Sequence, residues 1–219
     1  MALTAQEQQE INDLAQQFEA ATGAQAVAAV VGKADEYPDI PWKAFALGAA
    51  LAALAVVADA LIRPHWASFH TPLRDVAAIL ATGVLCGVAA MAIPSFGRLF
   101  LNRGRARGEA RQYAQDFFLR REVFATAGRV GILILVARFE RRIVILPDSG
   151  IARHVSAREL NDIIAVMAPH LANAQPVQAF RTGFDALAAL LKQKGVQLGV
   201  QLARNGNELA DDVVVEEGA

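Results

Sequence analysis

Two long apolar blocks dominate the pattern of hydrophobic and polar positions along the chain. The first covers residues 44–62, between Lys43 and Arg63, and the second covers residues 76–93. As helices, blocks of this length rise about 28 Å, close to the hydrocarbon thickness of about 30 Å. A buried helix pair in a soluble domain is the alternative, but two adjacent all-apolar segments are difficult to bury in so short a chain. The pattern therefore predicts a transmembrane helical hairpin over residues 43–95.

The segment before the hairpin, residues 1–42, predicts one helix and one strand. Thr4 and Glu7 have the spacing of a capping box, which marks the start of a helix. Apolar residues then recur at helical intervals: Ile11, Leu14, Ala15 and Phe18. Gly23 is a natural helix stop. The apolar run "AQAVAAVVG" that follows has no helical face and predicts a buried strand.

The segment after the hairpin, residues 96–200, predicts a helix, two strands and two further helices. The first helix covers residues 107–124, and "GILILVARFERRIVIL" then forms a hairpin of strands with its turn at Glu140 and Arg141. Ser156 begins a helix that we expect to end near residue 167, and Pro176 begins the last helix. Residues 201–219 are expected to form a disordered acidic tail.

The order of these elements defines the fold class. One helix and one strand cannot bury a core alone, so the elements before and after the apolar hairpin must complete each other. We therefore expect an α/β fold, in which a small sheet is sandwiched between helices and interrupted by a two-helix transmembrane hairpin. The hairpin is tolerable there because it returns the chain to the side that it left.

Composition narrows the classes of partner. The chain of 219 residues carries 21 Lys and Arg against 22 Asp and Glu, so its overall charge does not favour nucleic acid. The single cysteine, Cys86, excludes an intrachain disulfide and lies in the second apolar block. The polar, acidic start of the chain lacks the basic and apolar regions of a secretory signal.

Arginines around the hairpin predict its orientation. Five follow the second block, whereas the connection between the blocks carries two, Arg63 and Arg74. Because positive residues favour the cytoplasmic side, we expect a multi-pass protein of the bacterial inner membrane with both termini cytoplasmic. The stretch "RGRARGEAR" would lie against anionic lipid; nucleic-acid binding is the alternative. The five arginines are Arg98, Arg103, Arg105, Arg107 and Arg111.

Polar residues in or near the predicted membrane region have two interpretations each. Asp59 is either an intramembrane ion or proton site or, as we favour, the partner of Arg63 four residues later. His65 and His70 lie in the short connection, where solvated histidines are more typical than a metal site lacking further ligands.

Several stretches resemble the TPM domain family, whose name joins thylakoid-lumen, photosystem-repair and acetylcholine-receptor-modulator members. They are the opening "TAQEQQEINDLAQQFEAATGAQAVAAVV", "AQDFFLRREV", the hairpin "RVGILILVARFERRIVILPDSGI" and the last amphipathic helix. The matching positions in the hairpin are Gly131, Glu140, Arg141, Arg142, Asp148 and Gly150. The two apolar spans are similar to those of a bacterial, membrane-embedded subgroup of the family.

The resemblance implies a possible cation site. Family members have been called phosphatase-like, some bind calcium, and those with a metal site carry acidic loops after the first strand and after the strand hairpin. The matching residues here are Asp35, Glu36, Asp39 and Asp148, although "LPDSGIARH" replaces the family's glycine-rich run. Calcium needs about six to eight oxygen ligands, so these carboxylates would need help from backbone and water. Solvation and helix capping are the alternative roles.

The sequence favours a non-catalytic function. It contains no phosphate-binding glycine loop, no Cys-x₅-Arg signature and no Asp-x-Asp pair, and His154 near Asp148 and Ser149 has no further support as a catalytic group. We therefore assign no catalytic residue and no obligatory cofactor. The expected role is a membrane-anchored interaction or assembly factor for an unidentified membrane-protein partner, with a phosphatase-like or calcium-binding enzyme as the alternative.

Overall fold

The computed structural model describes residues 3–62, 70–126, 128–195 and 213–218. The chain divides into two compact units. The α/β unit comprises residues Met1–Asp35 and Ala106–Ala219, and the helical unit comprises Glu36–Arg105.

The α/β unit begins with α1 (Ala5–Thr22), which has the local signals expected from its sequence. Thr4 and Glu7 form the predicted capping box, and Gly23 ends the helix with a φ of 74°, in the left-handed region that glycine adopts easily. The buried face of α1 is the predicted one: Ile11, Leu14, Ala15 and Phe18. The chain then turns directly into β1 (Gln25–Lys33).

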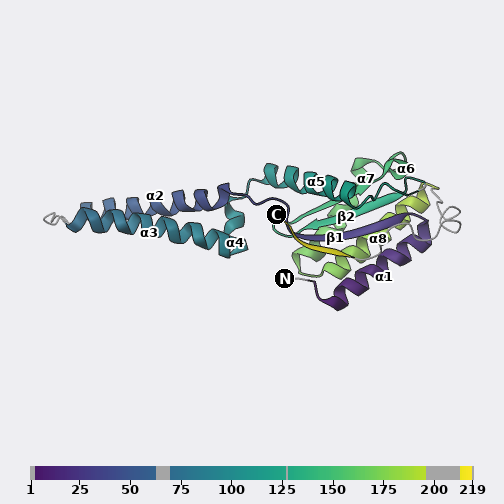
Figure 1. Ribbon diagram of the computed structural model, residues 1–219, viewed down its shortest axis with the longest axis horizontal. Helices are drawn as coiled ribbons and strands as arrows, with labels where there is room; N and C mark the ends of the chain where they lie inside the picture. Colours follow the sequence, from purple (N-terminus) through teal and green to yellow (C-terminus); the bar gives the residue numbers. More distant parts are fainter. Residues whose placement is uncertain (1–2, 63–69, 127, 196–212, 219) are drawn as a thin grey trace. The chain divides into compact units, whose positions relative to one another are not determined.

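A mixed four-stranded sheet with the order β3-β2-β1-β4 forms the centre of this unit (Figure 1). β2 (Gly131–Ala137) runs parallel to β1, with Gln25 opposite Gly131 and Val31 opposite Ala137. β3 (Arg142–Pro147) runs antiparallel to β2, after the predicted turn at Glu140 and Arg141. The strand before the apolar hairpin therefore pairs with the strand after it, and the predicted α/β fold class is confirmed.

Helices cover both faces of the sheet, as the alternation of side chains requires. On one face, α1, α7 (Ala157–Ala172) and α8 (Pro176–Gln193) pack against Ala28, Ile132 and their neighbours. On the other face, α5 (Arg103–Arg120) contributes Ala110, Ala114 and Phe117. A parallel pair such as β1 and β2 needs a crossover connection, and α5 forms the last part of it. A short helix, α6 (Ser149–Ala152), follows β3.

Three bounds in the α/β unit differ from the sequence-based expectation. α5 runs from Arg103 to Arg120 and not over residues 107–124. α7 does not end near residue 167 but continues through Pro169 to Ala172. The C-terminal tail is not wholly disordered, because Val214–Gly218 forms β4, which pairs in parallel with the outer edge of β1. The rest of the expected tail that precedes residue 213 lies outside the described residues.

The helical unit contains the two predicted apolar helices, α2 (Asp39–Ile62) and α3 (His70–Ala92), followed by α4 (Pro94–Gly97) and the 3-10 turn η1 (Arg98–Phe100). α2 and α3 pack as an antiparallel pair, with glycines at the closest approach: Gly48 beside Cys86, and Gly83 beside Phe45. Both helices are long and apolar enough to cross a membrane, and only 6% and 11% of their most apolar windows are buried. Their large side chains therefore point mainly outward, including Leu51, Leu54, Leu80 and Leu85.

Candidate functional site

The four carboxylates that the resemblance singled out do not form one cluster. Asp35 follows the last residue of β1, Lys33. Asp148 lies at the other end of the sheet, because its N–H donates to the carbonyl of Gly131, which pairs with Gln25 at the start of β1. The length of β1 separates the two ends by roughly 26 Å. A single cation site that includes both Asp35 and Asp148 is therefore inconsistent with this sheet.

The sheet directions explain this separation. β1 and β2 run parallel, so their carboxyl ends lie at one end of the sheet. β3 runs antiparallel and returns the chain to the end where β2 begins. The loop after β1 and the loop after β3 must then lie at opposite ends.

Asp39 belongs to the helical unit, where it joins the first turn of α2 to the segment after η1. Its Oδ2 accepts from Lys43 Nζ at 2.5 Å, and its Oδ1 accepts from Arg105 Nη1 at 2.8 Å. The guanidinium of Arg105 also lies over the ring of Tyr37, 5.4 Å from its centroid. Two cations therefore already compensate the charge of Asp39. Nearby, Asp35 is half-buried and Glu36 is exposed.

Asp148 is a buried helix cap. Its side chain is only 8% exposed, and its Oδ1 accepts from the N–H of Ser149 at 2.6 Å at the start of α6. Its Oδ2 faces the guanidinium of Arg129 at 4.0 Å. A Cβ on Gly150 would lie 2.5 Å from the carbonyl oxygens of Gly128 and Arg129, so glycine is needed for this close packing. These contacts give Asp148 a structural role, and Ser149 and His154 are both exposed beside it.

No group of three or more His, Cys, Asp or Glu side chains that could hold a metal ion occurs among the described residues. Asp148 and Glu140 each have one buried carboxylate oxygen that has no hydrogen-bond partner among the described residues. Each of these buried carboxylates stands apart from the other, because Glu140 lies in the turn between β2 and β3 and Asp148 follows β3. A calcium site formed by Asp35, Glu36, Asp39 and Asp148 therefore stays a prediction, and no cluster of potential metal ligands among the described residues supports it.

A different polar cluster, which sequence reasoning missed, lies where β4 meets α5. Glu216 of β4 accepts a hydrogen bond from the hydroxyl of Tyr113 at 2.5 Å. Its other oxygen lies 3.5 Å from Arg121 Nη2, and Arg120 Nη2 lies 3.8 Å from Oε2. Burial and the neighbouring Glu216 carboxylate raise the pKa of Tyr113 above its ordinary value of 10.0. Tyr113 is therefore held neutral, as a donor to Glu216, at physiological pH.

Aromatic rings support the two arginines of this cluster. The guanidinium of Arg120 lies 5.8 Å from the ring centroid of Tyr113, and that of Arg121 lies 5.6 Å from the centroid of Phe117. Arg120 also pairs with Asp116 on the preceding turn of α5, at 2.7 Å. Planar, stacked guanidinium groups are suited to carboxylate recognition. Three consecutive valines before Glu216 are typical of a strand, but the acidic residues on both sides of them favoured a disordered tail in the sequence analysis.

Backbone contacts position β4 along the edge of β1. Val214 lies opposite Ala29 and Glu216 opposite Val31. The N–H of Val213, just before the strand, donates to Asn12 Oδ1 of α1 at 2.6 Å. Two glycines permit the approach: a Cβ on Gly32 would lie 2.4 Å from the carbonyl oxygen of Glu217, and one on Gly218 would lie 1.8 Å from that of Lys33.

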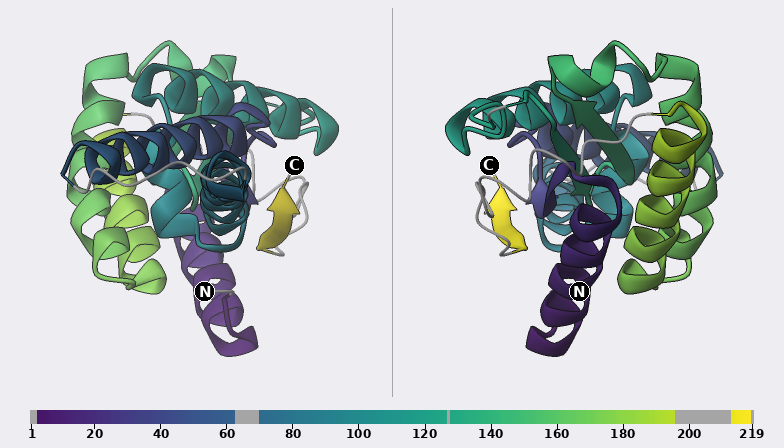
Figure 2. Two further views of the ribbon diagram at one scale, coloured as in Figure 1. Left: turned by 90° about the vertical axis from the view of Figure 1, so that its left-hand side faces the viewer. Right: turned by 90° about the vertical axis from the view of Figure 1, so that its right-hand side faces the viewer.

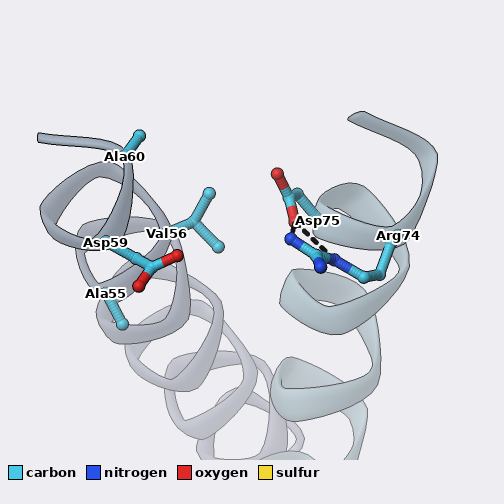
Figure 3. A pocket seen from close by; sticks show the side chains of 6 residues that line it. All are labelled: Ala55, Val56, Asp59, Ala60, Arg74 and Asp75. Carbon is cyan, nitrogen blue, oxygen red and sulfur yellow. Dashed lines mark hydrogen bonds and ion pairs between the residues drawn. The ribbon is translucent and has the colours of Figure 1, made fainter. Parts of the chain in front are cut away.

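A pocket of about 240 Å³ lies between α2 and α3 in the helical unit (Figure 3). Asp59 lines it from α2, and the ion pair of Arg74 with Asp75, 2.9 Å apart, lines it from α3. Figure 3 shows these polar groups on facing helices, with Ala55, Val56 and Ala60 beside them. The expected partner of Asp59, Arg63, lies outside the described residues, as do His65 and the side chain of His70, so those interpretations stay predictions.

Comparisons with known proteins agree with the fold. The family model described as the TPM domain matches residues 88–190. The NMR structure of BA42 protein, from the psychrophilic bacterium Bizionia argentinensis, is similar with a TM-score of 0.55 over 97% of this chain and 94% of that chain. The two sequences are 14% identical, so this likeness concerns the fold alone. A search of curated proteins gives no significant match. Residues 88–190 therefore resemble the TPM domain, and the chain shares its fold with the BA42 protein.

Proposed function

We propose that this chain is a membrane-anchored TPM domain protein that binds a protein partner and does not catalyse a reaction. The observation that carries this proposal is the structural use of the acidic residues. Asp148 caps α6, Glu140 accepts from the backbone of Ala34, and Asp39 is paired with Lys43 and Arg105. Carboxylates occupied in this way support the fold.

The outward-facing side chains of α2 and α3 support the membrane anchor. Leu54 and Leu61 are 65% and 77% exposed, and Leu73 and Leu85 on α3 are 65% and 69% exposed. In water, each such leucine would forgo about 1.5–3 kcal/mol of transfer free energy. Lipid removes this surface from water, whereas a monomeric soluble protein rarely tolerates so large an apolar patch.

The distribution of positive residues supports the proposed orientation. Arg98 and Arg103 follow α4, and Lys43 lies in the first turn of α2, so they flank the ends of the hairpin that adjoin the α/β segments. The opposite end carries Arg63 and Arg74 in sequence. By the positive-inside rule, this distribution supports a protein of the inner membrane with its α/β unit and both termini in the cytoplasm.

Topology reporters test the anchor and its orientation. A reporter fused after Gly218 is expected to show cytoplasmic activity, and one inserted at Ser68 is expected to show periplasmic activity. A matched fusion at Asn102 should behave like the Gly218 fusion, because both flank the same end of the hairpin. A periplasmic signal at Gly218 would overturn the orientation, and release of the protein by alkaline carbonate would overturn the anchor.

Cross-linking in membranes tests the interaction role. The tagged full-length chain is cross-linked in cells, purified in detergent and compared with a Val30→Asp variant, whose unpaired buried carboxylate disrupts the sheet. We expect a protein that co-purifies with the parent chain and not with the variant. Turnover of p-nitrophenyl phosphate by the purified parent, absent from Val30→Asp, would contradict the non-catalytic function.

A further inference from the structure

The C-terminal segment completes the sheet as an added edge strand. β4 has five residues and pairs only with β1, from Ala29 to Lys33, whereas β2 pairs with β1 along seven positions. The segment is far from β1 in sequence, and 20 residues, 194–213, separate the end of α8 from β4. Figure 1 shows it beside β1, at the outer edge of the sheet, and in Figure 2 it is the yellow arrow near the C label.

The edge of β1 has the features of a binding site for an extended chain. β1 also pairs with β2 along seven positions, so its place in the sheet does not rest on β4 alone. The edge of β1 that faces away from β2 offers backbone N–H and C=O groups, which can pair with any strand that lies beside it. Gly32 leaves room for the incoming backbone, and Asn12 of α1 supplies an acceptor at the point where the strand enters.

Side chains of α5 and of Arg121, which follows it, contact alternate residues of β4. Val214 packs against the apolar cluster of Ala110, Phe117 and their neighbours. Glu216, two residues later on the same face, contacts Tyr113, Arg120 and Arg121. Two residues further, Gly218 with a φ of 87° meets the carbonyl of Lys33 too closely for any Cβ. The site therefore recognises the pattern apolar-x-Glu-x-Gly in a strand parallel to β1.

The rest of β4 adds little to this recognition. Val215 is 40% exposed, and Glu217 is also exposed on the outer face. A five-residue edge strand held by one neighbour is weak on its own, and strand pairs need packing to be stable. The contacts of β4 are thus a local set that a segment of the same pattern from another chain can replace.

We propose that the β1 edge and the Tyr113, Arg120 and Arg121 side chains form a strand-addition site for an extended acidic segment of a partner protein, which displaces β4. This inference rests on the proposed partner-binding function and names its site and the chemistry of its ligand. Addition of a strand to an exposed sheet edge gives affinity through backbone bonds and specificity through alternate side chains. β4 is the chain's own competitor, because a segment of the same chain competes with a partner segment at a high effective concentration.

A peptide of residues 211–219, "DDVVVEEGA", labelled with fluorescein, is the probe for this site. The hosts are the full-length chain in detergent and two full-length variants that release β4 in different ways. Gly218→Val introduces a Cβ against the carbonyl of Lys33, and Glu216→Lys reverses the charge that meets Arg120 and Arg121. We expect both release variants to bind the probe about tenfold or more tighter than the parent, because the tethered competitor is gone.

Charge reversal tests the recognition itself. A matched peptide in which the residue equivalent to Glu216 is lysine should bind the Gly218→Val host about tenfold more weakly, since it loses charge-assisted contacts. Adding Arg120→Glu and Arg121→Glu to that host should reverse the preference and favour the lysine peptide. Equal binding of both peptides, or no binding to either release variant, would overturn the inference. Dimers of the intact chain linked by exchanged tails would assign the edge to a second copy instead.

A comparison of pull-downs separates this inference from the proposed function. The parent chain and its Arg120→Glu/Arg121→Glu variant are cross-linked in membranes and purified in parallel. We expect the partner to be lost from the variant, while the thermal unfolding of the α/β unit stays similar, because both arginines are half-exposed at the surface. A partner retained equally by both would refute the strand-addition site and leave the interaction role standing. A parent chain without any partner would refute the interaction role.

Discussion

Glu140 accepts a hydrogen bond from the backbone N–H of Ala34, at 3.0 Å, although 106 residues separate them in sequence. Glu140 lies in the turn between β2 and β3 and is 6% exposed. Two further hydrogen bonds join this turn to the end of β1: the N–H of Arg138 donates to the carbonyl of Val31, and the N–H of Phe139 donates to the carbonyl of Gly32. The strand hairpin of the TPM domain therefore fixes the point at which the chain leaves the sheet.

Replacing Glu140 should weaken the α/β unit more than its place in a turn suggests. In Glu140→Ala, the N–H of Ala34 loses its acceptor in a buried position, which costs about 1–3 kcal/mol of unfolding free energy. Glu140→Gln should cost less, because the amide oxygen still accepts. The urea midpoint from pulse proteolysis in detergent measures the effect. Asp162→Ala, at an exposed position of α7, is the control; an equal shift in control and Glu140→Ala would contradict the structural role.

The discontinuous fold predicts that the segment after the hairpin cannot fold alone. A fragment of residues 105–218 lacks β1, which lies between β2 and β4, and also lacks α1. We expect no cooperative unfolding transition by circular dichroism. A matched chain in which residues 1–35 are joined to 106–219 by a flexible linker restores the sheet and should unfold cooperatively. A cooperative transition in the isolated fragment would show that β1 is dispensable.

Local signals predicted much of this fold, because they act within a few residues. The capping boxes at Thr4 and Ser156 are both formed, and Pro176 begins α8 as expected. α7, however, extends past its expected end near residue 167 and through Pro169. The helix continues because α7 packs its buried Ile163 and Met167 against the core, and such tertiary packing outweighs the loss of one backbone donor.

The candidate site was harder to predict because it depends on strand direction and on contacts distant in sequence. The sequence named Asp35 and Asp148 correctly as loop residues but did not specify that β1 runs parallel to β2, which places the loop after β1 and the loop after β3 at opposite ends of the sheet. Glu216 contacts Tyr113 across 103 residues, and no local pattern indicates such a pair. A charged tail also resembles disorder until an edge strand is available to pair with it.

Acid should weaken the packing of α7 against α8 through Glu159. Hydrogen bonds from Lys194 and from Ser156 lower the pKa of Glu159 from 4.5 to about 2. A carboxyl group whose pKa is lower in the folded state stabilises the fold above pH 4.5, and this contribution is lost as the pH falls towards 2. The urea midpoint of the parent should therefore fall between about pH 5 and about pH 2.5. Glu159→Gln retains the capping box and should show a smaller fall; an identical pH profile would contradict the prediction.

The close packing of α2 on α3 can be tested with the single native cysteine. A Cβ on Gly48 would lie 2.7 Å from the Sγ of Cys86 and 2.9 Å from its Cβ. A disulfide needs about 3.5–4.5 Å between Cβ atoms, so a small separation of the helices suffices to form one. In membranes treated with copper phenanthroline, Gly48→Cys should therefore lose both free thiols, measured by maleimide labelling and mass spectrometry. Leu51→Cys, one turn along the helix and 57% exposed, should remain labelled. Oxidation of both variants to the same extent would mean that the helices do not pack through Gly48.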